Sequence, residues 1–237
     1  MMSGILSPAF LQAAGRAGKE KFSGIKLFTL ATDPEISSIT GTDLVIKTIK
    51  GGVSHEDTYS SLEDDTLLIS ADKDTEIIIT GTITECAIGG NTIYSRISVK
   101  NTALTSLNCS DCSALQELNL STNTALTSLN CSYCYALQEL NLSTNTALTS
   151  LECSSCSALQ ELNLSTNTAL TSLECGSCAK LVSISYPATN SNVSTAVAGA
   201  ITAATAADGT VYTDSAGAYY STIETAANNK GWTIEQL

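Results

Sequence analysis

Leucine and polar positions repeat through the middle of the chain with a period of 22 residues. The segment 101–122 reads "NTALTSLNCSDCSALQELNLST", and near copies follow it at 123–144 and 145–166. Each copy also contains a half-period of 11 residues, because 104–112 and 115–123 share the frame L-x-x-L-x-[L/C]-x-x-[N/C]. A period of this length indicates stacked repeats, in which the leucine positions of one repeat pack on those of the next.

The frame is recognisable from Ile83 onward and ends where Pro187 interrupts it. It is the signature of the leucine-rich repeat, and the chain resembles the short, cysteine-containing repeats of bacterial surface proteins such as the internalins. The resemblance implies an α/β, β-rich solenoid: a right-handed coil of about five turns over 83–187. Each turn would carry a parallel strand on the cysteine-bearing half and an extended segment opposite.

The residues on either side predict ends that cover the apolar faces of the terminal coils. We expect 1–23 to be an N-terminal helix or tail, with the helix over 7–22, and 24–82 to be a β-rich N-terminal cap. Within that cap the stretch 50–65, "KGGVSHEDTYSSLEDD", is predicted to be a polar loop. Residues 188–237 predict an α/β C-terminal cap with the order helix, strand, helix, strand.

Four Cys-x-x-Cys pairs have a spacing that is also used for zinc and thiol chemistry. Three lie in the copies named above, and the fourth lies in a copy that begins at 167 and then diverges. In the frame the first cysteine replaces an inward leucine, where a small apolar side chain fills a narrow core. The second stands at the corner that asparagine occupies in the other half, where a side chain must satisfy backbone groups. Zinc needs four converging ligands, whereas these cysteines form two parallel rows. We therefore predict a structural ladder without metal, made of Cys109, Cys112, Cys131, Cys134, Cys153, Cys156, Cys175, Cys178, Asn123, Asn145 and Asn167.

Composition and charge narrow the classes of partner. The formal net charge is −12, and only 14% of the residues are charged and 5% aromatic. Nucleic acids and anionic membranes are bound through Lys and Arg, so neither is an expected partner. No stretch is apolar for long enough to span a bilayer, so no membrane insertion is expected. The N-terminal segment does not fit a signal peptide, because its charges follow its apolar stretch; only the resemblance implies an extracellular or cell-surface location.

The sequence shows no catalytic constellation. His55 is the only histidine, and it lies in the predicted polar loop, so any arrangement with a histidine base would depend on it. A glycine-rich dinucleotide motif between a strand and a helix is absent, and so is a P-loop. We expect no catalytic residue, no cofactor and no bound metal.

The outward positions of the cysteine half vary between copies, whereas Gln116, Glu117 and Asn119 recur unchanged in three of them. Tyrosines are enriched at binding hot spots. We therefore predict a recognition surface at Asn108, Asp111, Asn130, Tyr133, Tyr135, Glu152 and Glu174.

Together with the resemblance, this surface predicts a non-catalytic module that recognises protein or glycan. One alternative is a structural spacer or an assembly subunit of a cell surface or virion, which associates through residues 1–22. The other is a thiol-based metal or redox protein. Neutral drift after duplication also explains the variable positions.

Overall fold

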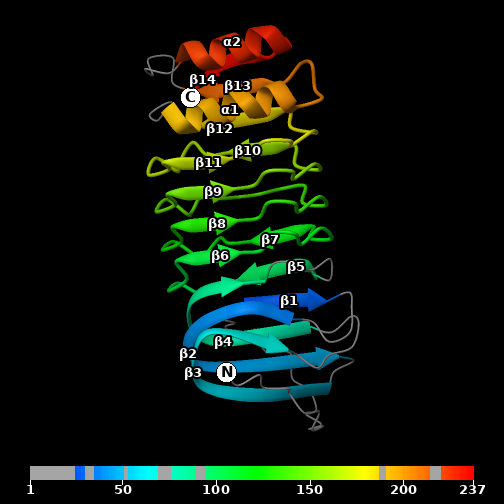
Figure 1. The fold of residues 1–237 in the computed structure, drawn as a ribbon, viewed down its shortest axis with the longest axis vertical. Helices are drawn as coiled ribbons and strands as arrows, with labels where there is room; N and C mark the ends of the chain where they lie inside the picture. The colour runs from blue at the N-terminus through cyan, green and yellow to red at the C-terminus, as the bar shows by residue number, and fades with distance from the viewer. Residues whose placement is uncertain are drawn as a thin grey trace.

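A computed structural model describes the chain over 25–29, 35–50, 53–68, 76–88, 94–186, 191–213 and 220–237. The described residues form a β-rich column of strands stacked one above another, with the early strands at one end and two helices at the other (Figure 1). The helix predicted over 7–22 lies outside the described residues.

Five strands, here called the cysteine face, stack along one side of the column. Neighbouring strands pair in parallel, and Leu107, Leu129, Leu151 and Leu173 stand directly opposite one another. Because this register equals the sequence repeat, every residue of a repeat lies beside its equivalent in the next. The strands of the cysteine face are β4 (Glu76–Ala87), β6 (Ser106–Asn108), β8 (Ser128–Asn130), β9 (Ser150–Glu152) and β11 (Ser172–Glu174).

The opposite side, here called the glutamate face, also consists of short parallel strands. β5 pairs with β7, a single bridge joins Asn141 to Asn163, and β10, β12, β13 and β14 pair in that order. The segments expected to be merely extended are therefore three-residue strands in two of the repeats. The strands are β5 (Tyr94–Val99), β7 (Glu117–Asn119), β10 (Glu161–Asn163), β12 (Ser183–Tyr186), β13 (Thr210–Thr213) and β14 (Thr233–Gln236).

The core is the space between the two faces. Within one repeat the apolar frame positions are all buried, and each leucine contacts the core formed by its equivalents. Burying a leucine side chain stabilises the folded state by roughly 1.5–3 kcal/mol, so each repeat adds its own share of stability. The buried leucines of the first perfect copy are Leu104, Leu107, Leu115, Leu118 and Leu120.

At the N-terminal end, antiparallel strands close the column. β1 (Ile25–Thr29) pairs with both β4 and β5, with Ile25 opposite Ile79 on one side and Val99 on the other, so it joins the two faces. β2 (Glu35–Lys50) pairs with β4 and with β3 (Val53–Leu68).

The polar loop predicted over 50–65 is wrong, because most of it belongs to β3. Lys47 and Glu56 stand opposite each other in the β2–β3 pair, and their side chains form an ion pair of 3.1 Å. Among the described strands β3 pairs only with β2, so it is an edge strand. Edge strands commonly carry charged residues, which hide the apolar alternation by which strands are recognised in a sequence.

At the C-terminal end, helices take over the cysteine side of the column while strands continue the glutamate face. α1 (Ser191–Ala203) packs against β11, and α2 (Tyr220–Lys230) packs against α1 (Figure 1). The order of helices and strands predicted for this end is present. Within the described ranges, neither helix combines the length and apolar character needed to cross a membrane.

Candidate recognition surface and its supporting ladders

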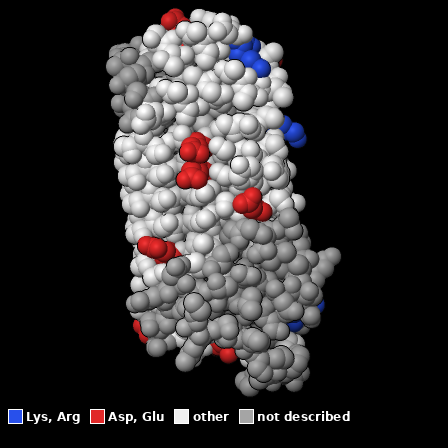
Figure 2. Space-filling model, viewed as in Figure 1, with Lys and Arg blue, Asp and Glu red and all other residues white. Residues whose placement is uncertain are grey.

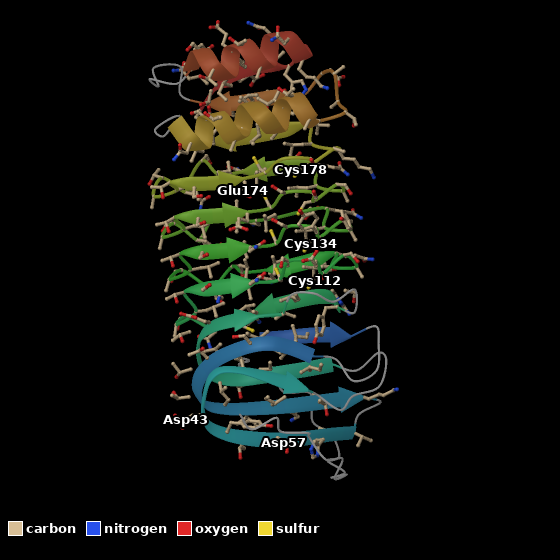
Figure 3. The ribbon with its side chains drawn as sticks, in the orientation of Figure 1. Asp43, Asp57, Cys112, Cys134, Glu174 and Cys178 are labelled. Carbon is tan, nitrogen blue, oxygen red and sulfur yellow. The ribbon has the colours of Figure 1, made fainter. Side chains whose placement is uncertain are left out.

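Two rows of cysteines run through the core beneath the cysteine face. All nine cysteines of the chain are free thiols and all are buried. In the second row each thiol donates to a carbonyl oxygen of the preceding repeat: Cys134 to Cys109 at 3.2 Å, and Cys156 to Cys131 at 3.2 Å. Cys112, Cys134 and Cys178 lie one above another inside the column (Figure 3). The second cysteine of each pair thus satisfies backbone groups at the corner.

A row of buried asparagines performs the same task at the opposite corner. Asn145 Nδ2 donates to the carbonyl oxygens of Asn123 at 2.8 Å and Leu120 at 3.2 Å, and Asn167 repeats the pattern one repeat later. The row begins earlier than predicted, because Asn101 Nδ2 donates to the Gly81 carbonyl at 2.9 Å. A signal for Asn101 is present in the sequence: it stands 22 residues before Asn123.

The thiols of the first cysteine row and Cys86 are poor nucleophiles. Thiol hydrogen bonds from the second row, followed by burial, raise the pKa of Cys109, Cys131 and Cys153 well above the ordinary value. Burial alone raises the pKa of Cys86 to about 12. Because the thiolate is the reactive form, these groups are protonated at neutral pH and do not offer ready metal ligands. Throughout the part of the chain that is described, no three His, Cys, Asp or Glu side chains form a group that could hold a metal ion.

The corners after β6, β8, β9 and β11 have a left-handed backbone. Asp111, Tyr133, Ser155 and Ser177 have φ values of 60°, 61°, 62° and 60°. Each stands immediately before the second cysteine of its pair and turns the chain so that this thiol points into the core. The backbone N–H of Tyr133 donates to the Ser154 carbonyl of the next repeat at 2.8 Å, which fixes one corner on another.

The predicted outward residues form two columns, one at the strand ends and one at the corner. Asn108, Asn130, Glu152 and Glu174 stand opposite one another along the cysteine face. The first three are half-buried and Glu174 is exposed (Figure 3). Asp111 and Tyr133 belong to the exposed corner column. In the view of Figure 2 the repeats are mainly uncharged, and acidic side chains interrupt this surface.

The two predicted anchor residues lie together. Tyr133 and Tyr135 are 45% and 49% exposed, and their ring centroids are 6.3 Å apart. The ring planes are 71° apart, in an edge-to-face arrangement. Ser132 is buried in the same turn, whereas the equivalent Ser110 and Ser154 of the neighbouring repeats are half-buried. The tyrosine pair is therefore a feature of a single repeat.

His55 is not part of this surface. It lies on β3, and its Nε2 is 2.7 Å from Asp57 Oδ2. This contact joins two side chains of one edge strand at the N-terminal end of the column, remote in the fold from Tyr133.

Comparisons with known proteins add one distant similarity. No protein-family profile matches the chain, and no curated protein matches it. Among solved structures the chain is similar to the functional domain of InlJ from Listeria monocytogenes, which "includes a cysteine ladder", at 23% identity and a TM-score of 0.33. The similarity covers 60% of this chain and 32% of that chain, so this chain spans about a third of the length of that structure.

Proposed function

We propose that the chain is a leucine-rich-repeat solenoid that acts as a non-catalytic binding module. Its recognition surface would be the cysteine face together with the corner that bears Tyr133 and Tyr135, and its partner a protein or a glycan. One observation carries the proposal: near-identical repeats differ at outward positions of one face, and an exposed aromatic pair occupies that face. In a binding protein, specificity resides in side chains that vary on a constant scaffold.

The scaffold beneath the proposed surface is well suited to hold side chains in place. Thiol and amide ladders tie each corner to the preceding repeat, and the backbone of Tyr133 is hydrogen bonded to the following one. Residues on such rigid supports lose little conformational entropy when they bind, so more of the contact energy appears as affinity.

A paired variant tests the proposal. Tyr133→Ser with Tyr135→Ser converts this corner to the residues that Ser155 and Ser157 provide one repeat later, so the fold is expected to be retained. Wild-type and variant protein, matched by circular dichroism, are compared for binding to extracellular proteins of candidate partner cells and to an oligosaccharide array. A ligand held by the wild type and lost by the variant supports the proposal. Equal binding of every ligand by both proteins contradicts it.

The structural-spacer alternative has support of its own. Ladders that run from Asn101 to Asn167 without interruption make a stiff rod, and such a rod needs no ligand. If neither ligand class binds the wild type in the same experiment, the spacer becomes the better proposal. Assembly through residues 1–22 would then appear as a concentration-dependent mass that falls to the monomer value when those residues are deleted.

A further inference from the structure

The tyrosine pair occupies a corner that small residues occupy in every neighbouring repeat. The residues equivalent to Tyr133 are Asp111 and Ser155, and those equivalent to Tyr135 are Ser113 and Ser157. The two half-exposed tyrosines have ring planes 71° apart, so their ring faces point in different directions. The equivalent corners of the neighbouring repeats carry short polar side chains. The corner is thus a small aromatic site surrounded by hydrogen-bonding groups.

The backbone conformation of Tyr133 is unfavourable for a tyrosine. With φ at 61° it adopts the left-handed conformation that glycine, asparagine and aspartate tolerate best, and a bulky residue there is strained. The neighbouring repeats meet the same requirement with Asp111 and Ser155. Because Asp111, Ser155 and Ser177 share this angle, it belongs to the repeat frame, and among these four corners only that of Tyr133 places a bulky aromatic residue there.

An oriented carboxylate lies on the repeat that follows the tyrosine pair. Asn130 Nδ2 donates to Glu152 Oε2 at 2.8 Å, while Asn130 Oδ1 accepts the N–H of Ser132 at 3.0 Å. Glu152 lies two residues before Ser154, and the Ser154 carbonyl accepts a hydrogen bond from the backbone N–H of Tyr133. The oriented carboxylate and the aromatic corner therefore lie on adjacent repeats at the same end of the cysteine-face strands.

We propose that this corner binds a neutral glycan, with a pyranose ring stacked on the tyrosines and its hydroxyl groups donating to Glu152. The proposal rests on the binding function proposed above and specifies its ligand. The C–H bonds of a sugar ring carry partial positive charge and are attracted to the negative face of an aromatic ring. A carboxylate accepts hydroxyl hydrogen bonds, and charge-assisted ones are the stronger kind.

Size and charge favour a neutral glycan over the other ligand classes. A stable protein interface buries about 800 Å² on each partner around an apolar core. Among the described residues, the other large exposed apolar side chains are Val53, Val182 and Leu237, which lie on β3, beside β12 and after β14, not at this corner. Glu152 and Glu174 on the same face repel sulfated and uronic sugars, which leaves uncharged ones.

The test uses three versions of the full chain, tetramerised on streptavidin to raise avidity. They are the wild type, Tyr133→Ser/Tyr135→Ser, and a transplant in which the same two changes are combined with Ser155→Tyr and Ser157→Tyr. The probes are an array of neutral glucose, mannose, galactose and N-acetylglucosamine oligomers, with sulfated and uronic oligomers alongside. We expect the wild type to bind one or more neutral oligomers, the double serine variant to lose about tenfold or more in affinity, and the transplant to recover binding.

The possible results separate this inference from the proposed function. A protein partner that depends on the tyrosines, without any bound neutral oligomer, overturns the glycan inference and leaves the binding function intact. Preferred binding of sulfated or uronic oligomers overturns it as well. If a neutral oligomer binds the double serine variant as tightly as the wild type, the tyrosine corner is not its site and the inference is wrong. If no protein or oligomer binds through this face, both proposals fail.

Discussion

Replacing the buried Asn145 should reveal how much the asparagine row contributes to stability. Its amide donates two hydrogen bonds, to Asn123 O at 2.8 Å and to Leu120 O at 3.2 Å. Each carbonyl also accepts one backbone N–H, so neither is left wholly unpaired when the amide is removed. At about 1 kcal/mol for each lost bond, Asn145→Ala should lower the free energy of unfolding by about 2 kcal/mol.

Cysteine at the same position provides a graded comparison. In the other half of the repeat a thiol makes a single bond of this kind, as Cys134 does to Cys109 O at 3.2 Å. Asn145→Cys therefore keeps one of the two bonds. It also removes Asn145 Oδ1, for which no hydrogen-bond partner exists among the residues the structure describes. The expected loss is about 1 kcal/mol, half that of the alanine variant.

The assay is urea unfolding followed by circular dichroism and by the fluorescence of Trp232, the single tryptophan, which lies in the last turn of the column. Asn141→Ala is the matched control, because the exposed side chain of Asn141 accepts hydrogen bonds within its own turn, from Ser143, and it should cost less than about 0.5 kcal/mol. If Asn145→Ala costs no more than Asn141→Ala, or if the cysteine variant is the least stable of the three, the ladder reasoning is refuted.

Three further outcomes are expected. Ser155→Gly should raise the free energy of unfolding by about 1 kcal/mol, because Ser155 has a φ of 62°, which glycine adopts without strain. Ser154→Gly, at a position outside the left-handed corner, should lower it. Urea unfolding midpoints of the two variants test this. Deleting residues 123–144 removes one whole repeat and joins two ends of the same register, so the protein should still fold. Its column should be shorter by one strand spacing, about 4.8 Å, as measured by small-angle scattering. Aggregation of the shortened chain would contradict this. The folded pKa of Cys86 lies at about 12 against an ordinary 9.0, so its stabilising effect is complete below pH 9 and is lost as the pH rises towards 12. The pKa values of Cys109, Cys131, Cys153 and Cys175 are raised in the same direction, so the urea midpoint should fall over that pH window. A constant midpoint would be the contrary result.

The repeats could be predicted from the sequence because a single frame specifies both the length of each repeat and which of its side chains point into the core. Once leucines recur at fixed positions, equivalent residues must stack, and the buried cysteines and asparagines follow from their places in the frame. Asn101 has the same signal as Asn123, whereas Cys86 stands in a degenerate copy of the frame at the start of the array.

Other features of the fold depend on contacts between distant segments, which a local sequence pattern does not indicate. β3 is mostly polar between Val53 and Asp65, and it becomes a strand because β2 pairs with it. β1 pairs with β4 and with β5, and the partners of Ile25 in these strands, Ile79 and Val99, lie 54 and 74 residues later in the chain. This closure of the column is therefore a long-range event. The left-handed angle of Tyr133 also could not be read from its residue type, because tyrosine is among the less expected occupants of that conformation.

The ladders have a direction along the chain. Cys134, Asn145 and Thr149 all donate from a later repeat to a carbonyl of an earlier one. During synthesis, each repeat that leaves the ribosome would therefore bring these ladder side chains to carbonyl acceptors that are already in place, while the backbone N–H groups of its corner wait for the repeat that follows. Such a chain could add one repeat at a time in the order of translation, each new repeat using the finished part as its template.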